Sequence, residues 1–208
     1  MNVLILGATG GTGIELVGRS LEDGHSVTAF VRSAERLSEF RDRIVIKEGD
    51  LLNRSALANA LCGQDAVLSG FGPRVPIAKE DAHLLWDFAA ALTGAMKESG
   101  VRRAVVISTA FLFKDSIIPP TYLAGKLFFP GVMADSADLE EVFQNSGLDW
   151  TLVRPPQLAN GAATGKYRVR IGHLPLFGFK ISRADVADYF VKALRDDSVL
   201  CKVVGVSN

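Results

Sequence analysis

The chain has 208 residues, 48% of them hydrophobic, and its 23 Lys plus Arg residues balance 23 Asp plus Glu residues. A chain of this length buries one sizeable core but would be cramped as two independent domains, so we expect a single domain over residues 1–208. The zero net charge gives no electrostatic reason to expect a nucleic acid or a membrane as partner, and a small, largely apolar ligand fits better.

The cysteines and the N-terminus add two negative expectations. Cys62 and Cys201 are far apart and lack the spacing of a zinc site or a disulfide framework, so we expect no metal and a reducing, cytoplasmic location. No basic region precedes the first apolar residues, and no apolar stretch approaches the roughly 20 residues of a membrane span. We therefore expect neither a signal peptide nor a transmembrane helix.

In chain order, short runs of Val, Ile and Leu alternate with longer helix-like segments. The expected strands are 3–6, 27–31, 44–46, 66–68, 104–107, 150–153 and 203–206. The expected helices are 12–22, 34–40, 54–61, 81–99, 136–145 and 182–195. Apolar strands that alternate with helices predict an α/β fold with a doubly wound, mainly parallel sheet and helices on both faces.

The first strand-to-helix junction carries the sequence GATGGTG. Gly7 suits a tight turn, Gly10 a close approach of the backbone to phosphates, and Gly13 close packing of helix on strand. Backbone N–H groups and the helix dipole can then hold a pyrophosphate, which favours a Rossmann-like domain over a plain turn. The loop residues that we expect to contact a dinucleotide are Gly7, Thr9, Gly10, Gly11 and Gly13.

The residues after the second and third strands bear on which dinucleotide is bound. An NAD site usually places a carboxylate after the second strand, whereas this chain has Arg32 and Ser33 there. An arginine suits a 2′-phosphate and favours NADP; the alternative is a solvated surface arginine. After the third strand, Asp50 and the backbone of Leu51 are placed to meet the adenine edge, although a turn aspartate is an equally simple interpretation.

Motifs over nearly the whole chain match one protein family. The glycine loop, the residues VRS at 31–33, GDL at 49–51 and SGLDWTLVRP at 146–155 resemble the atypical short-chain dehydrogenase/reductases of the NAD(P)-binding, NmrA-like type. Within that group the chain is most similar to the biliverdin-IXβ reductase and flavin reductase branch. The local matches are GQDAV at 63–67, STAFL at 108–112, PP at 155–156 and TGKY at 164–167.

The resemblance implies an NADPH-dependent reductase that transfers hydride to a flat conjugated acceptor, such as a flavin or a linear tetrapyrrole. In such a reaction the protein mainly positions two rings face to face. The cofactor positions carried over are Thr12, Arg32, Ser33, Asp50, Leu51, Gly72, Arg74 and Pro155, with Ser108 and Thr109 beside the nicotinamide. The acceptor site is expected in the loops at about 109–133 and 155–181, with Phe111, Phe113, Pro156 and Gln157 as its residues.

Two features depart from the branch. A histidine follows the Pro-Pro pair in that branch, whereas this chain has Gln157, which can donate a hydrogen bond but cannot act as an acid near neutral pH. The segment 114–133, rich in Pro, Phe and Tyr, is expected as a loop over the site or a partner surface. The departure at Gln157 weakens a tetrapyrrole assignment more than it weakens hydride transfer.

Two other functions stay open from the sequence. Tyr122 and Lys126 match the YxxxK signature of carbonyl-reducing relatives, in which Ser108 completes the triad, although Pro119 and Pro130 flank the motif and argue against a long helix. This alternative is a carbonyl or quinone reductase. The other is a dinucleotide-binding redox sensor without turnover, because cofactor recognition is better encoded here than chemistry. We expect a monomer or a small homo-oligomer.

Overall fold

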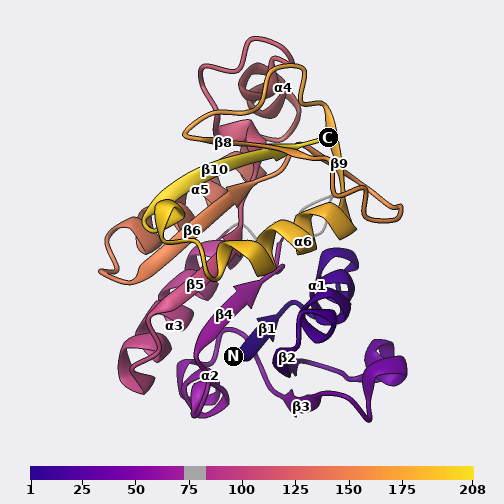
Figure 1. Cartoon of the computed structure of the whole chain (residues 1–208). Helices are drawn as coiled ribbons and strands as arrows, with labels where there is room; N and C mark the ends of the chain where they lie inside the picture. Colours follow the sequence, from indigo (N-terminus) through magenta and orange to yellow (C-terminus); the bar gives the residue numbers. More distant parts are fainter. Residues whose placement is uncertain (73–82) are drawn as a thin grey trace.

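Eight strands of the described chain form one sheet in the order β3-β2-β1-β4-β5-β6-β10-β8 (Figure 1). The computed structural model describes residues 1–72 and 83–208. The strands are β1 (Asn2–Leu6), β2 (Ser26–Val31), β3 (Val45–Glu48), β4 (Ala66–Ser69), β5 (Arg103–Ile107), β6 (Asp149–Arg154), β8 (Arg168–Ile171) and β10 (Lys202–Ser207). All neighbouring strands pair in parallel except β8, which runs antiparallel to β10 at the edge. The predicted strands are thus present within one or two residues of their expected bounds.

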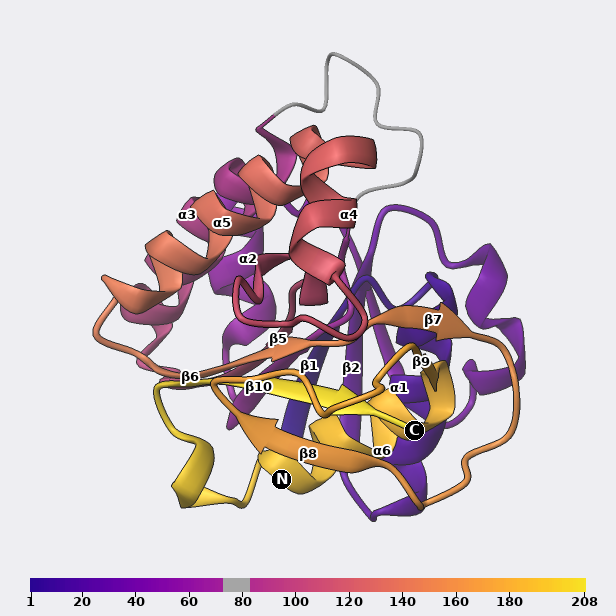
Figure 2. The ribbon, with the colours of Figure 1, turned by 90° about the horizontal axis from the view of Figure 1, so that it is seen from above.

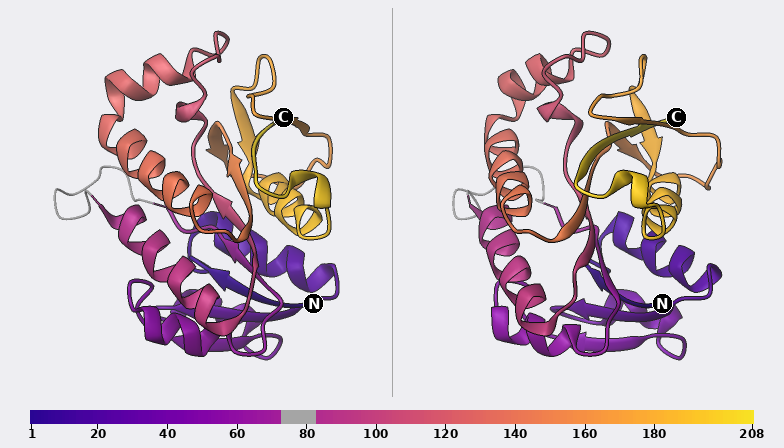
Figure 3. Two further views of the ribbon diagram at one scale, coloured as in Figure 1. Left: turned by 90° about the vertical axis from the view of Figure 1, so that its left-hand side faces the viewer. Right: turned by 60° about the vertical axis from the view of Figure 1, so that its left-hand side comes forward.

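Helices cover both faces of this sheet (Figures 2 and 3). One face carries α1 (Gly11–Glu22), α6 (Arg183–Ala193) and the short helix η1 (Glu35–Phe40). The other carries α2 (Arg54–Leu61), α3 (Leu84–Ser99) and α5 (Pro130–Gln144). Two short helices, η3 (Ala110–Leu112) and η4 (Asp197–Val199), lie in connections. The predicted doubly wound α/β fold is confirmed.

The core follows the two-residue period of β1. Val3 and Ile5 pack into the layer shared with α1 and α6, whereas Leu4 and Leu6 pack into the layer under α2 and α3. All four side chains are fully buried. A strand that is apolar on both faces needs a helix layer on each side, which explains the continuous apolar run that opens the chain.

The structure corrects the sequence prediction in the second half of the chain. Residues 114–133 are not a loop, because they contain α4 (Thr121–Phe128) and the first turn of α5. Pro130 stands at the first helical position of α5, where its missing N–H costs no hydrogen bond. The stretch 155–181 contains β8 and a separate parallel pair, β7 (Gln157–Ala159) with β9 (Lys180–Ser182). The expected start of a helix at residue 81 lies outside the described residues. Among the described helices, none is long and apolar enough to cross a membrane.

Candidate functional site

The junction between β1 and α1 needs glycine at two positions for packing alone. Gly7 has a φ of +70°, and a Cβ there would lie 2.7 Å from the backbone nitrogen of Phe71. A Cβ on Gly13 would lie 2.0 Å from the carbonyl oxygen of Gly7. The turn is closed by the Gly10 N–H, which donates to the same oxygen at 2.9 Å. The close contact of α1 with the end of β1 therefore depends on Gly7 and Gly13.

Gly10 is different, because its glycine identity is not required by the fold. Its φ is −77°, which any residue adopts, and a Cβ there would meet only the Gly7 carbonyl oxygen at 3.2 Å. Gly10 precedes α1, whose first N–H groups lack intrahelical acceptors and form a natural anion site. The missing side chain leaves open space beside this helix end, which is the geometry that a pyrophosphate requires.

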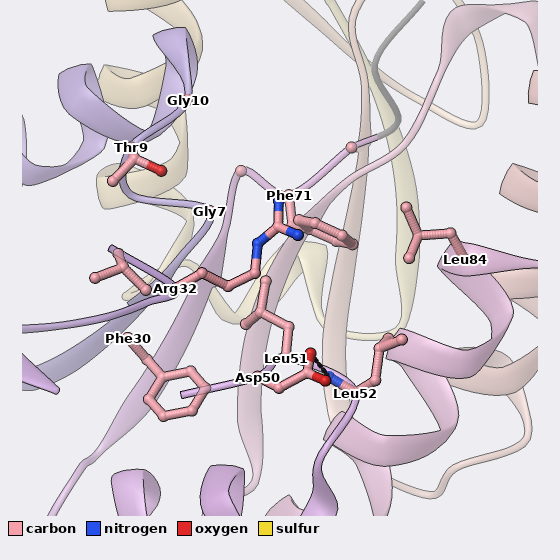
Figure 4. Close-up of a pocket in the computed structure, with 13 residues that line it drawn as sticks. Gly7, Thr9, Gly10, Phe30, Arg32, Asp50, Leu51, Leu52, Phe71 and Leu84 are labelled. Carbon is pink, nitrogen blue, oxygen red and sulfur yellow. Dashed lines mark hydrogen bonds between the residues drawn. The ribbon is translucent and has the colours of Figure 1, made fainter. Parts of the chain in front are cut away.

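A cavity of about 400 Å³ opens at this point (Figure 4). It lies past the carboxyl ends of β1, β2 and β4. Its lining residues are Gly7, Thr9, Gly10, Phe30, Val31, Arg32, Asp50, Leu51, Leu52, Gly70, Phe71, Gly72 and Leu84. We call it the first cavity. It brings together half of the predicted cofactor residues, from the four loops that follow β1, β2, β3 and β4.

Two charged residues line the first cavity, and their side chains differ in orientation. Figure 4 shows the Arg32 guanidinium extending into the space between Gly7 and Leu51. The Asp50 carboxylate instead turns back on its own loop and accepts the Leu52 N–H at 3.0 Å. The arginine is thus directed towards a ligand, whereas the aspartate closes a turn.

The first residue of α3, Leu84, reaches the first cavity because α5 holds the start of α3 in place. Asp135 of α5 is 1% exposed and accepts the backbone N–H groups of Leu85 at 3.0 Å and Trp86 at 3.2 Å. Burial raises the pKa of the Asp135 carboxyl, against the lowering effect of these two hydrogen bonds. A side chain from another helix therefore caps α3 beside the cavity.

A second cavity, of about 390 Å³, lies past the ends of β5 and β6. Its lining residues are Thr109, Ala110, Phe111, Pro119, Pro120, Thr121, Ala124, Phe129, Pro155, Pro156, Gln157 and Phe179. Because β4 pairs with β5 and all these strands are parallel, both cavities open at the same edge of the sheet. Open α/β sheets bind ligands at this edge.

Ring stacking and hydrogen bonds connect the chain segments that form the second cavity or adjoin it. The rings of Phe111 and Phe129 stack with centroids 5.3 Å apart, which joins η3 to the connection between α4 and α5. The segment before α4 is tied to the loop before β9 by a hydrogen bond between Asp115 and His173, and this bond lowers the pKa of the Asp115 carboxyl. The Phe177 N–H also donates to the Ile118 carbonyl oxygen at 3.2 Å.

Ser108, at the end of β5, belongs to a buried polar network. Its hydroxyl donates to Oε1 of Glu140, a residue of α5 that is 2% exposed. Arg154, at the end of β6, donates two hydrogen bonds to the same carboxylate, from Nε at 2.8 Å and from Nη2 at 2.6 Å. The Arg154 guanidinium also lies over the Phe113 ring, 4.7 Å from its centroid. The single proton of Ser108 is thus held by Glu140, and its oxygen keeps lone pairs that can only accept. Ser108 is among the lining residues of neither the first nor the second cavity.

Comparisons with known proteins agree with this site. The profile of a family described as NAD(P)H-binding matches residues 7–197. The chain belongs to this NAD(P)H-binding family. An uncharacterised chloroplast protein of Arabidopsis thaliana is 30% identical over 98% of this chain and 75% of its own length. A Streptomyces protein named 3-diazoavenalumate denitrifying reductase is 31% identical over 85% of this chain and 64% of its own length.

Solved structures share the fold over the whole chain. A short-chain dehydrogenase/reductase of Veillonella parvula in complex with NADP has a TM-score of 0.82 at 20% identity, covering 100% of this chain and 94% of that one. An anaerobilin reductase of Escherichia coli has a TM-score of 0.81 at 22% identity, covering 100% and 97%. At such identities the likeness shows the fold alone. The predicted place among the atypical short-chain dehydrogenase/reductases is confirmed at the level of the NAD(P)H-binding family.

The remaining predicted cofactor residues of this NAD(P)H-binding protein do not line the first cavity in the part of the chain that the structure describes. Gly11, Thr12 and Gly13 continue into the first turn of α1. Ser33 is exposed next to Arg32. Arg74 lies outside the described residues. Pro155 lines the second cavity instead of the first.

Some predicted acceptor residues lie elsewhere than expected. Phe113 does not line the second cavity: it is 2% exposed and packs under Arg154, so its role as a substrate contact stays a prediction that this position does not support. Tyr122 and Lys126 lie on α4, but neither is among the lining residues, and the hydroxyl of Ser108 turns to Glu140. The second cavity therefore does not bring Ser108, Tyr122 and Lys126 together among its lining residues.

Several residues of the two cavities carry no signal in the sequence. Leu84 and Thr121 reach them because α3 and α4 begin at these residues, whereas Phe71 follows β4 next to the predicted Gly72. Glu140 looks like one of two adjacent surface acids, and its pairing with Arg154 depends on how α5 packs on β6. For Glu140 the one usable signal is its place between the buried positions Leu139 and Phe143 of the same helix.

Proposed function

We propose that the chain is an NADPH-dependent reductase that transfers hydride to a flat conjugated acceptor. The observation that carries the proposal is the pair of cavities at one edge of the sheet. The first has a glycine turn and a helix N-terminus for a pyrophosphate, and the second is lined by proline and aromatic side chains. A dinucleotide that extends along this edge from β2 towards β5 brings its nicotinamide to the second cavity.

The preference for NADPH over NADH rests on the end of β2. Arg32 extends into the first cavity and can pair with a 2′-phosphate through charge-assisted hydrogen bonds. The Asp50 carboxylate, which would suit a ribose 2′-hydroxyl, is engaged by the Leu52 N–H. A positive group that faces the cavity and a carboxylate that turns away both favour the phosphorylated cofactor.

The residues near β5 and β6 favour hydride transfer without an acid from the protein. When bound, the cofactor supplies the hydride. Ser108 accepts hydrogen bonds, because Glu140 holds its proton, and Thr109 lines the second cavity. Gln157 can donate a hydrogen bond to the acceptor but supplies no proton near neutral pH. The proton therefore comes from water, which suits an acceptor whose reduced form is a delocalised anion.

The names of two relatives support a reductase. The Streptomyces relative is named as a reductase, and one structural neighbour is named as an anaerobilin reductase. The structure of another neighbour contains NADP. These names support the reaction class and the cofactor, and they leave the acceptor to be measured.

The proposal is tested by oxidation of NADPH and NADH against FMN, riboflavin, biliverdin, a naphthoquinone and a simple ketone. Cofactor binding is measured in parallel by quenching of protein fluorescence. We expect NADPH consumption with at least one conjugated acceptor and none with the ketone. Tight binding of NADPH without turnover on any acceptor would instead identify a redox sensor.

One observation favours a carbonyl reductase as the second candidate. Tyr122 and Lys126 lie four residues apart on α4, so they share a helix face, and their neighbours Thr121 and Ala124 line the second cavity. If this pair is catalytic, Tyr122→Phe abolishes turnover of a ketone while NADPH binding persists. We expect Tyr122→Phe to leave reduction of the conjugated acceptor within about threefold, since a phenol is not needed as acid there.

A further inference from the structure

The side chains that line the second cavity are apolar or neutral polar ones. Prolines form much of its wall, at positions 119, 120, 155 and 156, and aromatic rings add Phe111, Phe129 and Phe179. Its polar side chains are Thr109, Thr121 and Gln157. Within residues 1–72 and 83–208, none of the lining side chains is charged. An anionic group placed in this space would lose its water without gaining a cation, which costs several kcal/mol in a protein interior.

The arginines closest to the cavity walls already have partners. The Arg154 guanidinium holds the buried carboxylate of Glu140. Arg168, on the edge strand β8, donates to the carbonyl oxygens of Leu176 at 2.6 Å and Asn208 at 2.9 Å. A carboxylate or phosphate in the cavity would have to break one of these arrangements to pair with Arg154 or Arg168. Lys126 and Lys180 lie close in sequence to lining residues, but neither side chain lines the cavity.

The size and the surroundings of the cavity agree with this chemistry. Its volume of about 390 Å³ is near the lower end of the range for small-molecule sites, roughly 300–1,000 Å³. Exposed apolar side chains occur on or next to lining residues: Phe179 lines the cavity and is 55% exposed, Ile118 precedes Pro119 and is 43% exposed, and Phe177 is 57% exposed. The backbone hydrogen bond from Phe177 to Ile118 keeps two of them together. The space suits a fused ring system without charged substituents.

From these observations we propose that the second cavity selects an uncharged, flat acceptor and rejects acceptors that carry an anionic group on the ring. The inference rests on the proposed function, since it concerns the acceptor of the same reductase. It names the acceptor class as neutral fused-ring compounds such as naphthoquinones. Linear tetrapyrroles with two carboxylates and ring-sulfonated quinones fall outside that class.

The test compares a naphthoquinone with its ring-sulfonated derivative, which share one ring system and differ by one negative charge. The sulfonate withdraws electrons and makes the quinone intrinsically easier to reduce, so slower turnover of the sulfonate reports on binding in the cavity. We expect kcat/KM to be at least about tenfold lower for the sulfonate, a difference of about 1.4 kcal/mol. Equal or faster turnover of the sulfonate overturns the proposal.

A binding measurement separates this proposal from the proposed function. Equilibrium dialysis of both quinones needs no turnover when the full chain is loaded with a redox-inert NADPH analogue whose nicotinamide ring is uncharged. Preferential binding of the neutral quinone without any turnover would refute the proposed reductase function but support the proposed selection of neutral ligands. Turnover of both quinones with equal affinity would support the reductase function and refute the selection of neutral ligands.

A charge introduced into the lining provides the matched control. Gln157 is exposed at the cavity, so Gln157→Lys places a cation there with little risk to the fold, and Gln157→Met keeps a similar length without charge. We expect Gln157→Lys to raise the sulfonate-to-neutral ratio of kcat/KM about tenfold and Gln157→Met to leave that ratio unchanged. If Gln157→Lys does not raise the ratio, lining charge does not govern selection and the proposal is wrong.

Discussion

The two glycines Gly10 and Gly13 stand three residues apart, yet the structure predicts opposite consequences for their substitution. In Gly13→Ala the new Cβ would lie 2.0 Å from the Gly7 carbonyl oxygen, so the backbone must move. Overpacking typically costs about 1–3 kcal/mol, and we expect at least about 3 kcal/mol here because the obstructing atom is backbone. In Gly10→Val the new Cβ would lie 3.2 Å from the same oxygen, so a small shift suffices, and valine is a poorer N-cap than glycine. We therefore expect a cost of about 1–2 kcal/mol, smaller than at Gly13.

For NADPH binding we expect the specific effect at Gly10: Gly10→Val should weaken binding in a protein that remains folded. The valine side chain fills the space where the pyrophosphate approaches the first turn of α1. Each lost hydrogen bond to a charged group is worth about 1.5–3 kcal/mol, which corresponds to roughly 10-fold to 150-fold weaker NADPH binding in a protein that still folds. The helix supplies its own control in Gly18→Ala, because a Cβ there meets nothing within 4 Å. It should stabilise the fold by up to about 1 kcal/mol and leave NADPH binding unchanged.

Urea unfolding measures the stability of each variant, and NADPH titration of the same preparations measures its cofactor affinity. If Gly10→Val binds NADPH as the natural chain does, the phosphates do not approach Gly10 and the glycine loop is only a turn. If Gly10→Val loses stability as severely as Gly13→Ala, the space beside Gly10 belongs to the protein's packing and not to a ligand.

Three further substitutions test other parts of the site. Arg32→Glu should lower the NADPH-to-NADH ratio of kcat/KM by at least about tenfold, through loss of a phosphate partner and added repulsion; an unchanged ratio shows that another residue discriminates. Glu140→Ala strands the buried Arg154 guanidinium and should cost about 3–5 kcal/mol in urea unfolding, and a loss below about 1 kcal/mol contradicts the buried pair. Asp185, buried, accepts hydrogen bonds from Thr164 and other groups, which together lower its pKa against the raising effect of burial. The ionised Asp185 carboxylate therefore stabilises the fold above its unfolded pKa of about 3.9, and this stabilisation is lost as the pH falls through the lower folded pKa. Asp185→Asn should lower the free energy of unfolding at pH 7 by about 1.5–3 kcal/mol. Below about pH 4 the difference between the two proteins should become progressively smaller.

The sequence predicts the sheet well because its strands are buried on both faces. Such strands appear as continuous apolar runs, and the runs that open with Val3 and Trp150 stand out without any knowledge of neighbours. The helix α4 escapes the same reasoning, since prolines on either side predict a break. Pro120 and Pro130 in fact precede and begin helices, where proline is tolerated. Local composition does not distinguish a proline that ends a helix from one that starts it.

The first cavity is more predictable than the second for a related reason. Gly7 and Gly10 depend on backbone geometry at the end of β1, and Arg32 directly follows β2, so the local pattern places all three. In the second cavity, the path of α4 decides which aromatic ring faces the ligand. Phe129 lines the cavity, whereas Phe113 points into the core under Arg154, although both belong to the same aromatic-rich stretch.

Glu140 shows how one unpredicted contact changes the chemistry expected of a predicted residue. In sequence terms Ser108 at the end of β5 suits a proton-donating triad, because a hydroxyl there can serve as donor or acceptor. Once α5 packs on β6, Glu140 lies between Ser108 and Arg154, and the hydroxyl proton turns to the carboxylate. A serine in that state can accept hydrogen bonds but has no proton to donate to a ketone oxygen. An acceptor that can hold the incoming charge in its own conjugated system does not need such assistance, so the buried acid and the neutral, ring-lined cavity favour the same kind of substrate.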